Sequence, residues 1–177
     1  ASDYVTAADK RISRVIALTS LSADIVNYLS NESLVGIPGS SLLKKNNAYT
    51  SKKIISSGRM PPNLEKILKL KPDLVIGSNG FHDKTLKSIE KLGIKTISLS
   101  IRNFSDLEEM FSNFQVLLGK NNSVKLNNII RNCYRRSSKR KQNNKEILVL
   151  VSSKPILSPN SKSWAGSMID RFDYINL

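Results

Sequence analysis

The sequence has very few of the residues that build disulfide frameworks and metal clusters. Among its 177 residues there are one cysteine, one histidine and one tryptophan. A single cysteine cannot form an internal disulfide, and one histidine cannot supply the several imidazoles of a multi-histidine metal site. We therefore expect no metal centre.

Long apolar runs are also missing. No stretch approaches the roughly 18 consecutive apolar residues that a membrane-spanning helix needs. The first eleven residues, ASDYVTAADKR, lack the apolar core of a signal peptide. We therefore expect a chain that is either cytosolic or already processed. Its hydrophobic content of 40% still supports a real core.

Motifs of catalysis and nucleotide binding do not occur. The sequence contains neither GxGxxG nor GxxxxGK[ST], and it contains no GxSxG, HExxH or CxxC. No nucleophile, nucleotide or metal motif supports an enzyme. We therefore predict a protein that is not an enzyme and that carries no cofactor.

Acidic residues are absent from one strongly basic segment. The formal net charge is +14, and nine Lys and Arg residues lie between Lys120 and Lys145 with no acid among them. The charge pattern is typical either of a solvated helix face or of a surface for an anionic partner, such as phospholipid headgroups or nucleic acid. Aromatic residues within the segment are limited to Tyr134, which argues against single-stranded nucleic acid. Apolar residues at three- and four-residue steps predict an amphipathic helix here: Leu126, Ile129, Ile130, Cys133 and Tyr134.

Apolar runs rich in Val and Ile recur along the chain and alternate with helix patterns. Runs that are apolar throughout indicate strands covered on both faces, as in a parallel sheet between helix layers. The pattern predicts an α/β fold with a doubly wound parallel sheet. The runs are 14–20, 34–39, 53–58, 73–79, 95–101 and 146–153, and the helix patterns are 22–30, 63–71, 83–93 and 105–119.

Capping residues delimit two of these helices. Asn63 is expected to cap the helix 63–71, which Pro72 ends, and Ser105 with Glu108 forms a capping-box pattern at 105–119. Gly93 and Gly119 stand where helix C-caps belong. Four apolar residues of the helix 63–71 are expected to pack on the sheet: Leu64, Ile67, Leu68 and Leu70.

Small polar residues and glycines follow the predicted strands. In open parallel sheets, ligands bind in the crevice beyond the carboxyl ends of the strands. A lone histidine on such a loop, here His82, is more often a surface or capping residue than a ligand. The strand ends carry Thr19, Ser20 and Ser22, then Gly39 and Ser40, then Gly58 to Met60, Ser78 to His82, and Ser100 to Arg102. From them we take as candidate ligand-binding residues Ser20, Arg59, Met60, Asn79, Gly80, Phe81, His82 and Arg102.

Several stretches together resemble a known family. RVIALTSLSADIVNYL, PPNLEKILKLKPDLVIGSNG, LKSIEKLGIKTISL and ILVLVSSKPILSPNSKSWAGSMI are similar to periplasmic solute-binding proteins of ABC importers for iron complexes and cobalamin. The most specific block is NLExILxLKPDLV. The resemblance runs from about Arg14 to the end.

The resemblance implies two α/β lobes joined by a single helix. Residues 1–119 would form the N-terminal lobe, 120–145 the basic interlobe helix, and 146–177 the beginning of a C-terminal lobe. A complete member would continue well beyond residue 177. Most of that second lobe would therefore be missing.

The resemblance also implies a function. The chain would be periplasmic, or membrane-anchored outside the cytoplasm, and would deliver a ferric siderophore, haem or cobalamin to ABC permease subunits. Glu65 corresponds to a glutamate that pairs with permease arginines, although an acid in the first turn of a helix is favoured by the macrodipole anyway. Two alternatives stay open: a basic cytosolic α/β module that binds nucleic acid through 120–145, and an enzyme with an unrecognised site.

Overall fold

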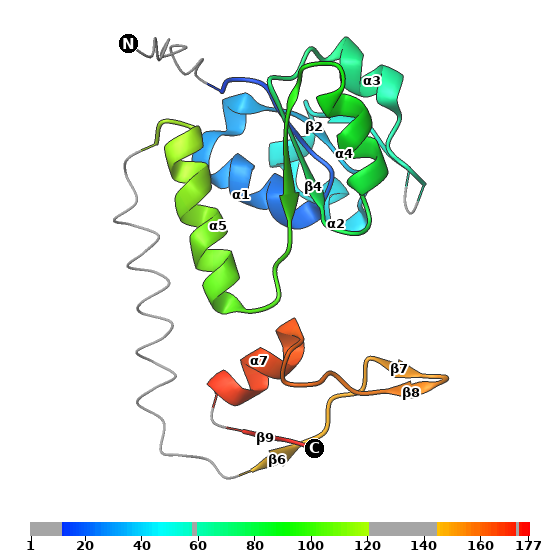
Figure 1. Cartoon of the computed structure of the whole chain (residues 1–177), viewed down its shortest axis with the longest axis vertical. Helices are drawn as coiled ribbons and strands as arrows, with labels where there is room; N and C mark the ends of the chain where they lie inside the picture. Colours follow the sequence, from blue (N-terminus) through cyan, green and yellow to red (C-terminus); the bar gives the residue numbers. More distant parts are fainter. Residues whose placement is uncertain (1–11, 58–59, 121–144, 173) are drawn as a thin grey trace, which may run out of the picture. The chain divides into compact units, whose positions relative to one another are not determined.

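The computed structural model describes residues 12–57, 60–120, 145–172 and 174–177 (Figure 1). The chain divides into two compact units. The first contains the described residues up to 99 together with 113–120, and the second contains 100–112 together with the described residues from 145 onward. Most of the predicted basic helix, residues 121–144, lies outside the described residues.

A five-stranded parallel sheet forms the centre of the first unit. Its strand order is β3-β2-β1-β4-β5, and every neighbouring pair is parallel. The predicted α/β fold with a doubly wound parallel sheet is thus confirmed. The strands are β1 Val15–Ala17, β2 Leu34–Ile37, β3 Lys53–Ile54, β4 Leu74–Ser78 and β5 Lys95–Leu99.

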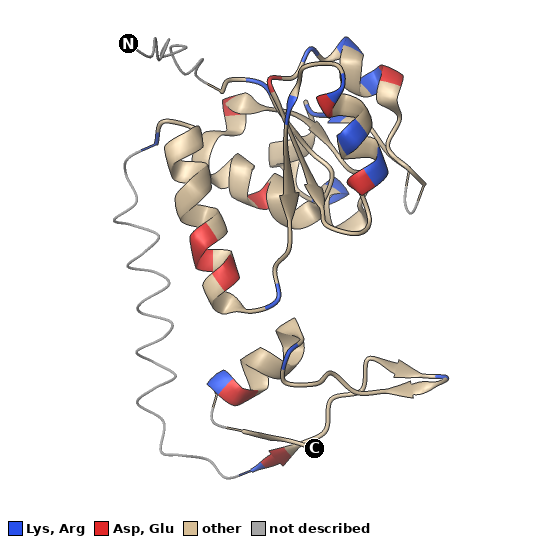
Figure 2. Ribbon diagram, in the orientation of Figure 1, with Lys and Arg blue, Asp and Glu red and all other residues tan. Residues whose placement is uncertain are grey.

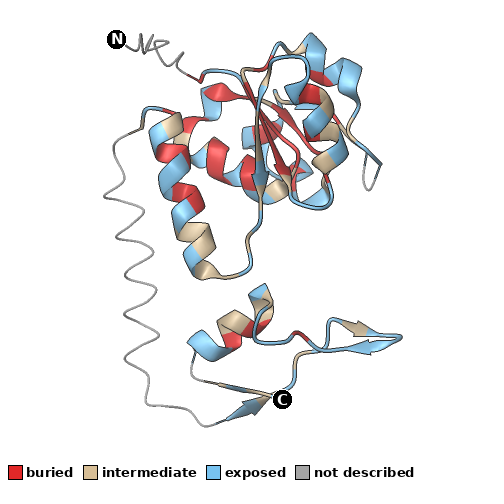
Figure 3. Cartoon of the chain, viewed as in Figure 1, coloured by how far each residue is buried: buried red, intermediate tan, exposed pale blue. Residues whose placement is uncertain are grey.

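Burial follows the position of each strand in the sheet. All residues of the central strand β1 and the first four residues of β4 are buried, because helices cover both faces there (Figure 3). The edge strand β5 has no fully buried residue. An edge strand has one neighbour instead of two, so its side chains keep more solvent contact.

Helices cover the two faces of the sheet. On one face, α3 (Leu64–Lys69) and α4 (Asp83–Glu90) bury Ile67, Leu86 and Ile89 against Ile16 and Val75. Helix α1 (Ser20–Ser30) follows β1 directly and packs on β1 and β2. A short excursion between β2 and β3 contains α2 (Ser41–Lys44) and a 3₁₀ turn at Asn47–Tyr49. The last helix before the undescribed segment is α5 (Phe104–Leu117).

The prediction for α3 is correct at its ends and partly wrong in its packing. Asn63 Oδ1 accepts a hydrogen bond of 2.9 Å from Lys66 N, and the helix ends before Pro72. Ile67 is fully buried, but Leu64 and Leu68 remain 36% and 37% exposed. With six residues α3 makes fewer than two turns, so one side chain faces the sheet squarely and the flanking leucines lie at its margin.

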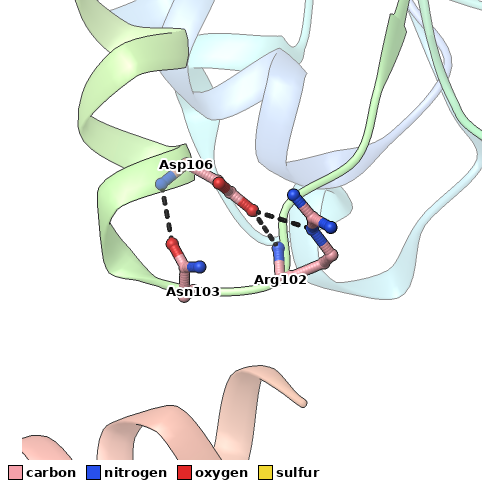
Figure 4. A network of polar contacts seen from close by, with 3 residues as sticks. All are labelled: Arg102, Asn103 and Asp106. Carbon is pink, nitrogen blue, oxygen red and sulfur yellow. Dashed lines mark hydrogen bonds and ion pairs between the residues drawn. The ribbon is translucent and has the colours of Figure 1, made fainter. Parts of the chain in front are cut away.

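The predicted capping box of α5 is wrong. The helix begins one residue before Ser105, and the cap is Asn103, whose Oδ1 accepts a hydrogen bond of 2.9 Å from Asp106 N (Figure 4). Asp106 in turn accepts from the backbone N–H of Arg102, also at 2.9 Å. An Asn at the N-cap competes well with Ser, so a cap two residues earlier in the sequence is used instead. The predicted C-caps are confirmed, because Gly93 and Gly119 have φ values of 78° and 63°.

The second unit differs from the prediction at 146–153. Only its two ends are strands: β6 (Glu146–Ile147) pairs in parallel with β9 (Ile175–Asn176), and β7 (Ser152–Ser153) pairs antiparallel with β8 (Ile156–Leu157). A continuous buried strand needs ladder partners along its length, and in the described part of the chain β6 has only the two-residue β9. The helix α7 (Trp164–Arg171) also belongs to this unit.

Candidate functional site

A pocket of about 360 Å³ lies at the carboxyl ends of β1, β2 and β4. After β1 the chain continues to β2 on one side, whereas β4 lies on the other side of β1. This reversal is the switch point at which open parallel sheets bind their ligands. The lining residues come from three loops: Leu18, Thr19 and Ser20; Pro38, Gly39 and Ser40; and Ser78, Phe81 and His82.

The first loop carries the N-terminus of α1 to the pocket. Thr19 caps the helix: its Oγ1 accepts a hydrogen bond of 3.1 Å from Ser22 N, and its carbonyl oxygen accepts from Ala23 N at 3.0 Å. The next two backbone N–H groups, those of Ser20 and Leu21, have no acceptor among the described residues. They are two of the four donors that a helix start leaves unsatisfied.

The third loop buries the only histidine of the sequence. His82 is 5% exposed. Its Nδ1 accepts a hydrogen bond of 2.9 Å from Ser78 N, and Phe81 meets its ring edge-on with the centroids 4.8 Å apart. His82 occupies the N-cap position of α4 but makes no side-chain capping bond. The surface interpretation of this residue is therefore wrong, and the capping interpretation is correct in position but not in the hydrogen bond.

Among the residues that the structure describes, the pocket lining contains no Lys, Arg, Asp or Glu. Burial lowers the pKa of His82 below its ordinary value of 6.5, and the nearby Asp83 opposes that shift only partly. The Asp83 carboxylate is engaged elsewhere, because its Oδ1 accepts a hydrogen bond of 3.0 Å from Gly80 N. His82 is therefore neutral near pH 7, and the polar groups of the pocket act as dipoles rather than as ions.

The structure brings some predicted site residues together and leaves others apart. Ser20, Phe81 and His82 line the pocket, whereas Met60, Asn79 and Gly80 do not. Arg102 follows β5 in the second unit, where its Nε lies 3.4 Å from Asp106 Oδ2. Arg59 lies outside the described residues. All the polar lining residues are among the predicted strand ends, whereas Leu18 and Pro38 are not, because apolar residues at strand ends look like core.

The described residues contain no metal-binding cluster. No group of three or more His, Cys, Asp or Glu side chains among them is arranged to hold a metal ion. Nor does any helix within the described ranges have the length and apolar character to cross a bilayer.

Glu65 lies on the first turn of α3, and its side chain is 74% exposed. It forms an i,i+4 ion pair of 2.7 Å with Lys69 Nζ. Figure 2 shows acidic and basic residues interspersed on α3 and α4. The Glu65 carboxylate can therefore be reached from solvent, as the docking role requires, and that role stays a prediction.

Comparisons with known proteins identify similar sequences and folds. A family model described as periplasmic binding protein matches residues 15–177. Among solved structures, an ABC transporter substrate-binding protein from Listeria monocytogenes EGD-e is 22% identical with a TM-score of 0.75, covering 93% of this chain and 64% of that one. No curated protein matches.

Two structures from Vibrio cholerae show the same likeness. A periplasmic haem-binding protein is 16% identical with a TM-score of 0.77, covering 92% of this chain and 65% of that one. A periplasmic vitamin B12-binding protein is 18% identical with a TM-score of 0.71, covering 94% and 66%. The chain thus spans about two thirds of the length of these structures, and at such identities the likeness concerns the fold.

Proposed function

Since this chain belongs to the periplasmic binding protein family, we propose that it is the solute-binding component of an ABC importer. It captures an iron complex, either a ferric siderophore or haem, or else cobalamin, and delivers it to a permease outside the cytoplasm. The observation that carries this proposal is the pocket at the switch point of the sheet, formed by the loops after β1, β2 and β4. Binding pockets of this fold type lie at that position.

The chemistry of the pocket favours an organic ligand over a bare divalent cation. A bare cation needs several His or carboxylate ligands. Within the described ranges, the pocket lining offers one His and no carboxylate. Apolar surface from Leu18, Pro38 and Phe81 next to hydroxyl and N–H donors suits a ligand with a large apolar body and polar groups. Solved relatives described as binding haem and vitamin B12, and one bound to acinetobactin and ferric iron, support the same ligand class.

We assign the ligand contacts to the candidate residues in two groups. Ser20, Phe81 and His82 contact the ligand inside the pocket. Phe81, whose side chain is 69% exposed, offers its ring to an apolar or aromatic part of the ligand. For the remaining candidates we propose contacts with anionic groups at the periphery of the ligand: Arg59, Met60, Asn79, Gly80 and Arg102.

Glu65 is the residue that we propose to meet the permease. Its carboxylate is exposed, and its only ion-pair partner among the described residues is Lys69, on the same helix. A permease arginine can replace that lysine at little cost, because an exposed i,i+4 pair contributes only about 0.3–0.5 kcal/mol. This arrangement leaves the pocket loops undisturbed during docking.

Titration of the protein in its full natural length tests the proposed function. Haemin, a ferric hydroxamate, a ferric catecholate and cyanocobalamin are each added while the fluorescence of Trp164 is followed and heat is measured in parallel. Saturable binding of one of them at micromolar or tighter affinity supports the proposal. If none binds, and the protein instead retains DNA at moderate salt, the nucleic-acid hypothesis replaces it.

A further inference from the structure

Some N–H donors at the pocket have no acceptor within the described residues. One is the backbone N–H of Ser20 at the start of α1, and the likewise unpaired N–H of Leu21 follows it in the same turn. Another belongs to the side chain of His82, which lines the same pocket as Ser20. Each group loses free energy if it stays desolvated without an acceptor. Ser20 and His82 line one cavity, so their donors indicate what the cavity receives.

The tautomer of His82 follows from its one side-chain hydrogen bond. A backbone N–H can only donate, so Nδ1, which faces Ser78 N at 2.9 Å, must be the unprotonated nitrogen. The neutral ring then carries its proton on Nε2. Nε2 has no hydrogen-bond partner among the described residues. If it were also fully enclosed, it would be a buried atom without a partner, but among these residues only Asn176 Oδ1 is such an atom. Nε2–H is therefore accessible from the pocket that His82 lines.

The start of α1 adds a positive electrostatic potential to these N–H donors. Its 11 residues are long enough to present the positive end of a helix dipole, together with the free N–H groups, to the Thr19–Ser20 wall. The hydroxyls of Ser20, Ser40 and Ser78 can each donate as well. Because the lining residues that the structure describes include no carboxylate, a negatively charged oxygen meets these donors without repulsion from them.

We propose that this end of the pocket is an oxyanion subsite, in which His82 Nε2–H and the backbone N–H of Ser20 together bind one carboxylate group of the ligand. The subsite deepens the proposed function, on which it rests, by selecting ligands that carry a peripheral carboxylate. A ligand whose polar groups are all neutral amides gains less there, because the helix dipole and converging donors favour a full negative charge.

The single histidine makes the test direct. The chain is labelled with ¹⁵N and observed by NMR at about pH 8, where an ordinary histidine is neutral. Acetate is titrated as the probe, with acetamide and chloride as controls at equal ionic strength. We expect the Nε2–H tautomer before any addition. We further expect acetate, but not its controls, to shift Nε2–H and the amides of Ser20 and Leu21 along one saturable curve.

Two matched substitutions locate the donor. In His82→Gln the amide NH₂ can take the place of Nε2–H, whereas in His82→Asn the shorter side chain reaches only the position of Nδ1. Acetate affinity, read from the Ser20 and Leu21 amides, should fall about fivefold or more in His82→Asn, as expected for one lost hydrogen bond, and less in His82→Gln. Circular dichroism verifies that both variants fold.

Any one of three results would overturn the subsite: an Nδ1–H tautomer of His82, identical chemical-shift changes with acetate and chloride, or equal acetate affinities of the two variants. If the variants do not fold, the comparison of acetate with acetamide on the unchanged chain decides alone. The acetate experiment does not depend on a transported ligand. If acetate binds but haemin, the siderophores and cobalamin do not, the proposed function is rejected and the subsite is kept. If one of these ligands binds but acetate does not, the subsite is rejected and the proposed function is kept.

Discussion

The backbone N–H of Ser78, the last residue of β4, donates a hydrogen bond of 2.9 Å to Nδ1 of His82. The carbonyl of Ser78 accepts from the backbone N–H of His82 at the same distance. These two bonds close the loop between β4 and α4 and hold the imidazole at the pocket. In a protonated ring, Nδ1 would carry a hydrogen that faces the N–H of Ser78, and the hydrogen bond would be lost. This pairing therefore depends on a neutral histidine.

The first prediction concerns pH. In the folded chain the pKa of His82 lies below 6.5, because burial disfavours the charged ring. Above pH 6.5 the ring is neutral in both the folded and unfolded states. As pH falls below 6.5, the unfolded chain takes up the proton first, so the free energy of unfolding should decrease until pH passes the folded pKa. Urea unfolding at about pH 7.5 and about pH 5.5 measures the decrease.

His82→Gln is the control for this prediction, because it removes the titrating group and should flatten the profile over the same range. The carboxylates with lowered pKa values, Glu32 and Asp106, titrate below this window and do not confuse it. Equal pH dependence in the variant and the unchanged chain would show that another group is responsible.

The second prediction concerns Gly77, which packs directly under His82. A Cβ atom there would lie 2.8 Å from His82 Cβ and 3.0 Å from Leu86 Cδ1. Gly77→Ala should therefore displace the imidazole and cost about 1–3 kcal/mol of unfolding free energy, as overpacking does. Thermal unfolding and the His82 NMR signals measure the two effects. Ser98→Ala, an exposed site opposite Gly77 in the strand register, should change neither.

The general fold could be predicted because it depends on composition along the chain. Apolar runs at β1 and β4 and helix patterns between the strands indicate a covered parallel sheet. The resemblance to periplasmic binding proteins is confirmed by the family model, which matches residues 15–177. The failure at 146–153 has a physical cause. The hydrophobicity of a segment indicates its tendency to be buried. A strand also needs a neighbouring strand for its hydrogen bonds, and that neighbour depends on residues elsewhere in the chain.

The third prediction tests the corrected start of α5. Asn103→Ala removes the cap acceptor of Asp106 N and should cost about 1 kcal/mol of unfolding free energy. Ser105→Ala, at the position that the sequence pattern favoured, lies inside the helix and should be nearly neutral or slightly stabilising. Urea unfolding of both variants measures the difference. A larger cost for Ser105→Ala would restore the capping box.

The polar residues that line the candidate site could be predicted from the sequence, but the burial of His82 could not. The run SNGFHD reads as a surface turn, and its polar composition does not show that His82 turns inward. One local signal could have indicated it: a glycine inside a strand, here Gly77, marks a position where another group approaches the backbone closely. Leu18 and Pro38 gave no such signal, because only the strand order β2-β1-β4 brings them to the same cavity.

The last prediction concerns Glu65 and the proposed permease contact. Glu65→Ala should leave ligand affinity unchanged, because the residue does not line the pocket, and should cost no more than about 0.5 kcal/mol of stability by losing an exposed pair. Transport in cells, or stimulation of the permease ATPase, should nevertheless fall several-fold, and Glu65→Arg should lower it further by like-charge repulsion.

Lys69→Ala is the matched control, since it breaks the same ion pair of 2.7 Å but keeps the carboxylate. Transport by this variant should equal that of the unchanged protein, or exceed it, because the carboxylate no longer has to leave a partner before docking. Ligand titration and transport are measured on the same three variants, so a loss of binding cannot be mistaken for a loss of docking. Full transport by Glu65→Arg would remove the docking role and leave Glu65 as an acid favoured by the dipole of α3.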